Sequence, residues 1–225
     1  MNEVVIRVRG EHEREVPAER GTARVVVRAQ GAEPGPVRAR VEAECVAVLA
    51  DVRAWHDPDS GPVRRYVVDQ VRTSVQHPSH KGRPRPPVHH ASVSLSVEFD
   101  DVARLGGWLS GLGGSENVQV RGIDWGLADD HRREIERAAR QEALRQALAR
   151  AQDYADALDL GPVRARSVAD VGLLDPRPAP VAARAFAAAP GGGAPESDDG
   201  LGALLAPDDI TVRAAVEAEF VVSPA

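Results

Sequence analysis

The stretch from Asp129 to Leu160 constrains the fold of this chain most, because neither proline nor glycine interrupts it. Its apolar residues recur at intervals of three or four, which is typical of one face of a helix. They are Ile135, Ala139, Ala143, Ala147, Ala151, Tyr154 and Leu158. Asp129 and Asp130 favour a helix start by capping, and Gly161-Pro162 ends it. Such a helix is on the order of 45 Å long, more than a small sheet covers, so we expect part of it to pack outside its own domain.

Composition is that of a soluble globular protein, with 43% hydrophobic and 28% charged residues among 225. This length suits one large domain or two small ones. The net charge of −6 is spread along the chain and no basic stripe stands out, so we expect no nucleic-acid partner. Cys45 is the single cysteine, which excludes an intramolecular disulfide and favours a small buried hydrophobe on a predicted helix.

The hydropathy pattern predicts no membrane span, because no window approaches the roughly 18 uninterrupted apolar residues that a spanning helix needs. The first ten residues alternate like a strand and lack a basic segment followed by an apolar one, which is the pattern of an export signal. We therefore expect a cytoplasmic protein.

Alternating apolar and polar residues predict a sheet with one buried and one solvated face. Val4–Gly10 predicts a first strand, and Glu11–Glu15 a charged turn. From Thr22 the expected order is strand, helix, strand, strand, helix, strand, which is the ferredoxin-like βαββαβ arrangement. The predicted segments are 22–30, 34–55, 63–76, 88–99, 102–112 and 118–127, with a bulge at Gly122 in the last. We therefore predict an α+β fold whose ferredoxin-like core carries an extra N-terminal strand.

The C-terminal part predicts a strand pair after the long helix. Residues 163–171 and 210–220 alternate in the manner of strands. The intervening segment 173–207 is rich in alanine, proline and glycine and is predicted to be a mobile loop. We therefore predict two domains. Residues 1–128 form the antiparallel sheet with its two helices, and residues 129–225 form the long helix and the C-terminal β-hairpin.

Three histidines, His77, His80 and His89, form the best local candidate for a metal site. They lie at the two ends of one hairpin loop, and imidazoles bind Zn, Ni or Cu. His90 would point to the opposite face of a strand from His89, so at most one of the two joins the site. A solvated polar loop is the alternative, because the spacing is not one of the strong zinc signatures.

The metal hypothesis predicts that the purified protein takes up Zn or Ni. The substitutions His80→Ala and His89→Ala are expected to lower the affinity, because each removes one imidazole ligand. Absence of measurable metal uptake in a titration would remove the hypothesis.

No catalytic constellation stands out in the sequence. Ser92, Ser94 and Ser96 alternate on the solvated face of a strand without the Gly-x-Ser-x-Gly pattern of a nucleophile. Gly111–Gly114 follows a predicted helix instead of preceding one, which is the reverse of a phosphate-binding loop. Paired aspartates are explained by helix capping and loop solvation. We therefore expect no enzymatic activity and no cofactor.

Four segments, taken in order, resemble the SIMPL-domain family, a widespread bacterial group with distant animal relatives. They are the opening strand Val4–Gly10 with Val16–Ala23, the strand Asn117–Val120 with Ile123–Asp129, the alanine-rich long helix ending in Leu160–Val163, and the tail Pro207–Val212 running to Phe220. The resemblance covers nearly the whole chain. It implies an α/β fold that self-associates, sometimes into rings or channel-like assemblies, and a link to stress tolerance. The family has no agreed catalytic residues.

The expected function is therefore that of a non-enzymatic, self-associating interaction protein, a homo-oligomer linked to the stress response. The alternative is a stress protein that binds a metal or a small ligand through the His77–His90 loop.

Overall fold

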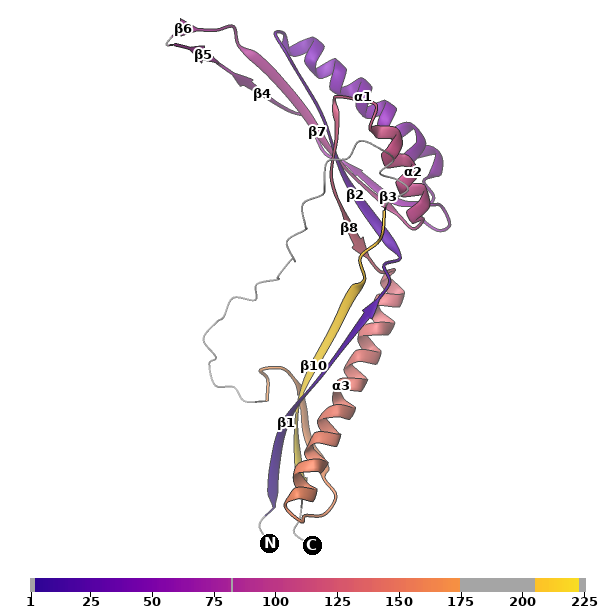
Figure 1. Ribbon diagram of the computed structural model, residues 1–225, viewed down its shortest axis with the longest axis vertical. Coiled ribbons are helices and arrows are strands. Elements are labelled where there is room, and N and C mark those ends of the chain that lie inside the picture. The colour runs from indigo at the N-terminus through magenta and orange to yellow at the C-terminus, as the bar shows by residue number, and fades with distance from the viewer. Residues whose placement is uncertain (1–2, 82, 175–204, 223–225) are drawn as a thin grey trace. The chain divides into compact units, whose positions relative to one another are not determined.

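The computed structural model describes residues 3–81, 83–174 and 205–222, and these divide into two compact units. The split unit comprises 3–16, 129–174 and 209–222, and the central unit comprises 17–128 and 205–208. The described residues form three helices and antiparallel sheets, which confirms the predicted mixed α+β class (Figure 1). Most of the predicted loop 173–207 lies outside the described residues. None of the three helices is long and apolar enough to span a membrane.

The central unit contains most of the elements. They are β2 (Arg20–Gly31), α1 (Pro34–Trp55), β3 (Val63–Val68), β4 (Arg72–Gln76), β5 (Ser79–His80), β6 (Arg83–Pro84), β7 (Val88–Phe99), α2 (Val102–Leu112) and β8 (Val118–Gly126). The sheet order is β3-β7-β2-β8, and β4 also pairs with β7. All of these pairings are antiparallel.

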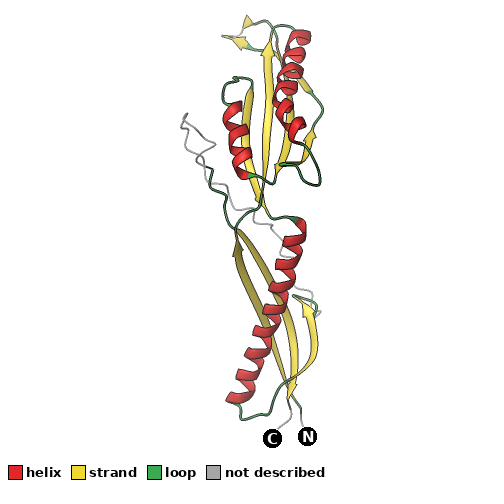
Figure 2. Cartoon of the chain, turned by 90° about the vertical axis from the view of Figure 1, so that its right-hand side faces the viewer, coloured by secondary structure: helices red, strands yellow, loops and turns green. Residues whose placement is uncertain are grey.

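Helices α1 and α2 cover one face of the central sheet (Figure 2). The expected inward register of β7 is confirmed, since alternate residues from Ala91 to Phe99 are buried under the helices with Val25 and Val27 of β2. Along a strand, neighbouring side chains point to opposite faces. The intervening residues, including Ser92, therefore lie on the other face, which no described helix covers. We call this the open face.

Three details of the central sheet differ from or refine the sequence prediction. The segment 63–76 is two strands, because the chain leaves the ladder at Asp69, whose N–H donates to the Ser94 carbonyl at 3.0 Å. Within the first of these strands the register shifts between Val63 and Arg65, so that Val63 is buried whereas Val67 pairs with Ser96 on the open face and is exposed. The predicted bulge in β8 is confirmed: Gly122 has a φ of 153°, and Arg24 and Val25 pair with positions 122 and 120.

The split unit has a three-stranded sheet of order β1-β10-β9, with α3 packed on one face. Its elements are β1 (Val4–Val16), α3 (Asp129–Ala157), β9 (Arg164–Asp170) and β10 (Ile210–Val222). The predicted antiparallel pairing of the two C-terminal strands is confirmed. The first strand, however, pairs with β10 along its whole length and so belongs with α3, whereas the sequence analysis grouped it with residues 1–128.

The charged turn predicted at Glu11–Glu15 is wrong, because β1 continues to the buried Val16. The three glutamates of this segment alternate with positions on the α3 side, so Glu11, Glu13 and Glu15 lie on the solvated face of a continuing strand.

The buried residues of helix α3 are spaced by four: Ile135, Ala139, Ala143, Ala147, Ala151 and Ala155. The last four, all alanines, pack in the core of the split unit with residues of β1 and β10. The prediction that Tyr154 and Leu158 continue this stripe is wrong, since both are exposed. Alanine brings the helix close to the strands, and a Cβ atom added at Gly10 of β1 would overlap the Ala143 carbonyl oxygen. Figure 1 shows α3 running along β1 and β10.

The long helix ends at Ala157, three residues before the predicted end at Leu160. Asp159 takes a left-handed φ of 53°, and the Leu160 N–H donates to the Ala155 carbonyl at 2.9 Å. This geometry is that of a helix C-cap, which reverses the chain before Gly161-Pro162 is reached.

Candidate functional site

The three candidate metal ligands lie on different elements of the β4–β7 hairpin. His77 follows β4, His80 belongs to β5 and pairs with Arg83, and His89 lies in β7 opposite Val75. No three histidine, cysteine or acidic residues gather into a metal-binding group within the described part of the chain. Metal binding by His77, His80 and His89 stays a prediction.

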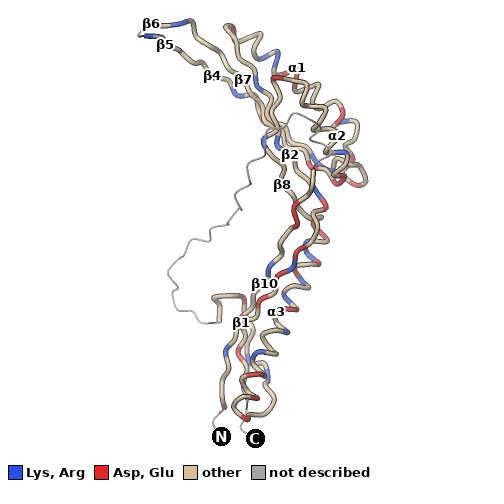
Figure 3. Tube along the Cα trace, in the orientation of Figure 1, with Lys and Arg blue, Asp and Glu red and all other residues tan. Residues whose placement is uncertain are grey.

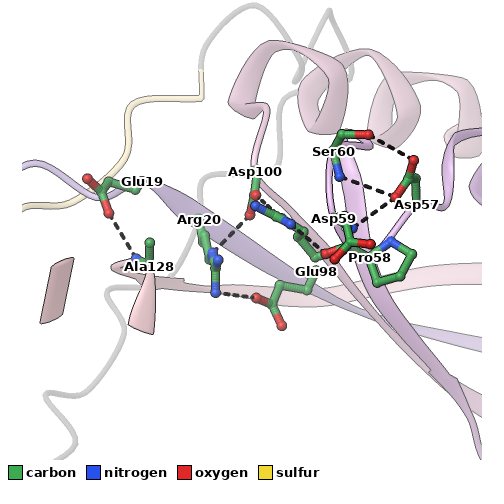
Figure 4. A network of polar contacts seen from close by, with 10 residues as sticks. Glu19, Arg20, Asp57, Pro58, Asp59, Ser60, Glu98, Asp100 and Ala128 are labelled. Carbon is green, nitrogen blue, oxygen red and sulfur yellow. Dashed lines mark hydrogen bonds and ion pairs between the residues drawn. The ribbon is translucent and has the colours of Figure 1, made fainter. Parts of the chain in front are cut away.

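A polar network lies where β2 begins and β7 ends (Figure 4). The Arg20 guanidinium contacts Glu98 at 3.2 Å and Asp100 at 2.9 Å. Arg64 of β3 donates to the other oxygen of Asp100 and to the Pro58 carbonyl. The hydrogen bond and charge of Asp100 raise the pKa of the Arg64 guanidinium. Strands β2, β3 and β7 are thereby tied together at one end.

The adjoining loop is organised by Asp57, whose carboxylate accepts from the Asp59 N–H at 2.9 Å, the Ser60 N–H at 3.2 Å and the Ser60 hydroxyl at 2.8 Å. The backbone bond from Asp59, followed by the two bonds from Ser60, lowers the pKa of Asp57 below its ordinary value. Hydrogen bonds to the charged form keep this group ionised, which suits turn formation and not proton transfer at neutral pH.

The tryptophans and the cysteine lie in the central core or pack against it, which for Cys45 agrees with the sequence prediction. Trp108 is buried, its ring lies 5.4 Å from that of Phe99, and its Nε1 donates to the Val48 carbonyl at 3.4 Å. Trp55 stacks under the Arg104 guanidinium at 5.2 Å. Cys45 packs partly buried against the core, and burial raises the pKa of its thiol, which disfavours the reactive thiolate.

The split unit presents a long unpaired strand edge. Each β1 residue from Val4 to Val16 has a partner in β10, and in the described residues no strand pairs with the other side of β1. An edge of this length offers a row of backbone N–H and C=O groups to a further strand. It is the feature of the described structure best suited to binding another chain.

Exposed apolar side chains lie on the same unit, including Val5 of β1, Leu148 of α3 and Val168 of β9.

Glu219 of β10 is almost fully buried at the centre of the sheet face that points away from α3. Its carboxylate accepts from Arg7 of β1 at 2.7 Å and contacts Arg166 of β9 at 3.2 Å. This pairing across three strands holds β1 in register with β10.

Sequence reasoning missed the length of this edge. The signal was present, because the positions from Ile6 through Val8 and Gly10 to Val16 keep a period of two. His12 and Arg14 at two of those positions concealed it.

One protein family matches the chain over nearly its whole length. No curated protein matches the chain. Residues 6–220 match the SIMPL family, described as a protein of unknown function (DUF541). The match spans β1 to β10 and therefore both units. The chain belongs to the SIMPL family.

Proposed function

We propose that this protein is a non-enzymatic interaction protein that self-associates through the outer edge of β1. The observation that carries the proposal is the unpaired edge running from Val4 to Val16. The carboxylates of the polar network around Arg20 each contact a guanidinium, Glu98 that of Arg20 and Asp100 those of Arg20 and Arg64. This pairing supports a structural role for these carboxylates instead of a catalytic one. The proposal includes a role in the stress response, which is implied by the family resemblance alone.

The charges on β1 favour pairing with a second copy of the same strand. Ile6 and Val8 face α3, so the odd-numbered residues lie on the opposite face. These are Val5, Arg7, Arg9, Glu11, Glu13 and Glu15, basic toward the start of the strand and acidic toward its end. Figure 3 shows charged residues along β1. An antiparallel pair centred on Gly10 would place Arg9 opposite Glu11 and Arg7 opposite Glu13 of the other copy.

This arrangement is two-fold symmetric, so each contact occurs twice. Oppositely charged residues directly across an antiparallel pair contribute roughly 0.2–1 kcal/mol each, and like charges oppose pairing. Four such pairs specify the register, while the backbone hydrogen bonds of the new ladder supply the main attraction. A parallel pairing in register would instead place like charges side by side.

Charge reversal tests this register. Arg9→Glu alone would place two acidic residues opposite each other at two points of the interface, and is expected to lower the molar mass by light scattering on a size-exclusion column. Glu11→Arg is expected to do the same with two basic residues. The double variant Arg9→Glu, Glu11→Arg restores opposite charges and is expected to recover the wild-type mass. Arg9 and Glu11 are 51% and 63% exposed, so the fold tolerates these changes.

Arg38→Glu is the matched control. Arg38 pairs with Glu42 on α1 at 2.7 Å, as Arg9 pairs with Glu11, and its exposure is similar at 65%. Reversal there is expected to leave the mass unchanged. A wild-type protein that is monomeric at micromolar concentration would contradict self-association. An oligomer that is indifferent to Arg9→Glu would contradict the β1 interface.

The ferredoxin-like interpretation of the central unit belongs to the same proposal. The strand order β3-β7-β2-β8, with α1 and α2 on one face, supports it.

The alternative function is metal or ligand binding by the His77–His90 loop. A chelator added to the light-scattering experiment separates the two, since an assembly that dissociates with chelator would favour the histidine site over the β1 edge.

A further inference from the structure

One row of side chains crosses the open face of the central sheet from β2 to β4. Arg28 of β2 lies directly opposite Ser92 of β7, and Arg72 of β4 lies opposite the same serine on its other side. The next residues, Ala29 and Ala91, are buried toward the helices, so all three members of the row point the other way. Two strand spacings separate the arginine backbones, roughly 10 Å, which places both guanidinium groups within reach of one ligand above the serine.

A cavity of about 840 Å³ lies over this row. His90 and Ser74 from the neighbouring row line it, and Arg40 from α1 contributes a third guanidinium. Glu116 is the one acidic residue in the lining. Three arginines against one glutamate leave the cavity basic, although the whole chain carries a net charge of −6. Its volume is in the range of small-molecule sites.

These arginines differ from others of the same sheet in their partners. On the same strand and the same face as Arg28, Arg24 binds Asp124 at 2.8 Å. Within the described ranges no carboxylate pairs with Arg28, Arg40 or Arg72. Three guanidinium groups with a single carboxylate in the same lining repel one another, and an anion between them relieves that repulsion.

We propose that this cavity binds the phosphate group of a phosphorylated small molecule. Arg28 and Arg72 grip the phosphate oxygens from two sides, each through the parallel N–H pair that fits a tetrahedral oxyanion. The Ser92 hydroxyl donates from below. The rest of the cavity accommodates the organic part of the ligand, with Arg40 at the rim. This site is independent of the β1 edge and does not involve His77, His80 or His89.

Calorimetric titration of the full chain with pyrophosphate and with inorganic phosphate tests the site, with sodium chloride at equal ionic strength as reference. Saturable binding of the phosphate probes is expected. Arg28→Gln and Arg72→Gln should each weaken it about tenfold or more, since a charge-assisted hydrogen bond contributes about 1.5–3 kcal/mol. Arg24→Gln is the matched control, because that arginine already has a carboxylate partner, and its affinity should stay near the wild-type value.

Three results would overturn the proposal: no heat beyond that of sodium chloride, an Arg28→Gln protein that binds like the wild type, or an equal loss with Arg24→Gln. A thermal melt of each variant confirms that the fold is retained. Exposed arginine changes are expected to leave the melting temperature nearly unchanged, so loss of binding reports on the ligand site.

Discussion

Replacing Gly10 by alanine is expected to destabilise the split unit by about 3 kcal/mol or more. The new Cβ atom would overlap the Ala143 carbonyl oxygen and lie 2.9 Å from the Ala147 backbone nitrogen. Both neighbours are backbone atoms of α3, which cannot rotate away as a side chain can. Overpacking of a buried site costs about 1–3 kcal/mol where side chains can adjust, so the cost here lies at or above that range.

The two units allow this loss to be localised. Trp55, Trp108 and Trp125 all belong to the central unit, so tryptophan fluorescence follows that unit, while far-ultraviolet circular dichroism follows both. In urea, Gly10→Ala is expected to lower the midpoint seen by dichroism and to shift the fluorescence midpoint much less. Gly35→Ala is the control, since a Cβ there meets no atom within 4 Å. An unchanged dichroism midpoint for Gly10→Ala would contradict the close contact.

Truncation of Phe99 to alanine is expected to destabilise the central unit by about 3–5 kcal/mol, the usual cost of removing a buried aromatic ring. Phe99 is fully buried, and its ring lies against Trp108. The loss combines the transfer free energy of the ring with the cavity left between β7 and α2. Because Trp108 borders that cavity, the fluorescence transition itself should move to lower urea.

Phe220→Ala provides the reciprocal control. Phe220 is equally well buried but lies in the core of the split unit, with Ile6 and Ala147. The same substitution there is expected to move the dichroism transition and to spare the fluorescence transition. Identical responses to Phe99→Ala and Phe220→Ala in both signals would show that the two units unfold together.

Local patterns predicted the elements well where one face of an element is buried. Strict alternation from Ala91 to Phe99 identified β7 and its inward face. Spacing by three and four identified α3, and a glycine in mid-strand marked the bulge of β8. Each of these signals reflects contacts that a residue makes within a few positions of itself, so a single sequence contains them.

Pairing between strands that are distant in the chain was harder to predict from the sequence. The partner of β1 is β10, at the other end of the chain, and an alternating strand carries no local sign of which strand it will join. For the same reason the basic cavity could not be predicted from the sequence. Arg28 and Arg72 are distant in sequence and meet only through the register of β4 on β7. The apolar stripe of α3 was predicted to run from Ala151 to Tyr154, whereas the buried position is Ala155, four residues after Ala151, and Tyr154 is exposed.

The pairing of Val4 with Val222 has a consequence for synthesis on the ribosome. Translation proceeds at about 5–20 residues per second, so β1 would wait on the order of 10–40 s before β10 emerges. The central unit needs mainly residues 17–128 and can fold during that interval. Until α3 emerges, β1 has neither a partner strand nor a helix to cover Ile6 and Val8. Its dense charge then acts as a gatekeeper against aggregation, well before it contributes to any assembly.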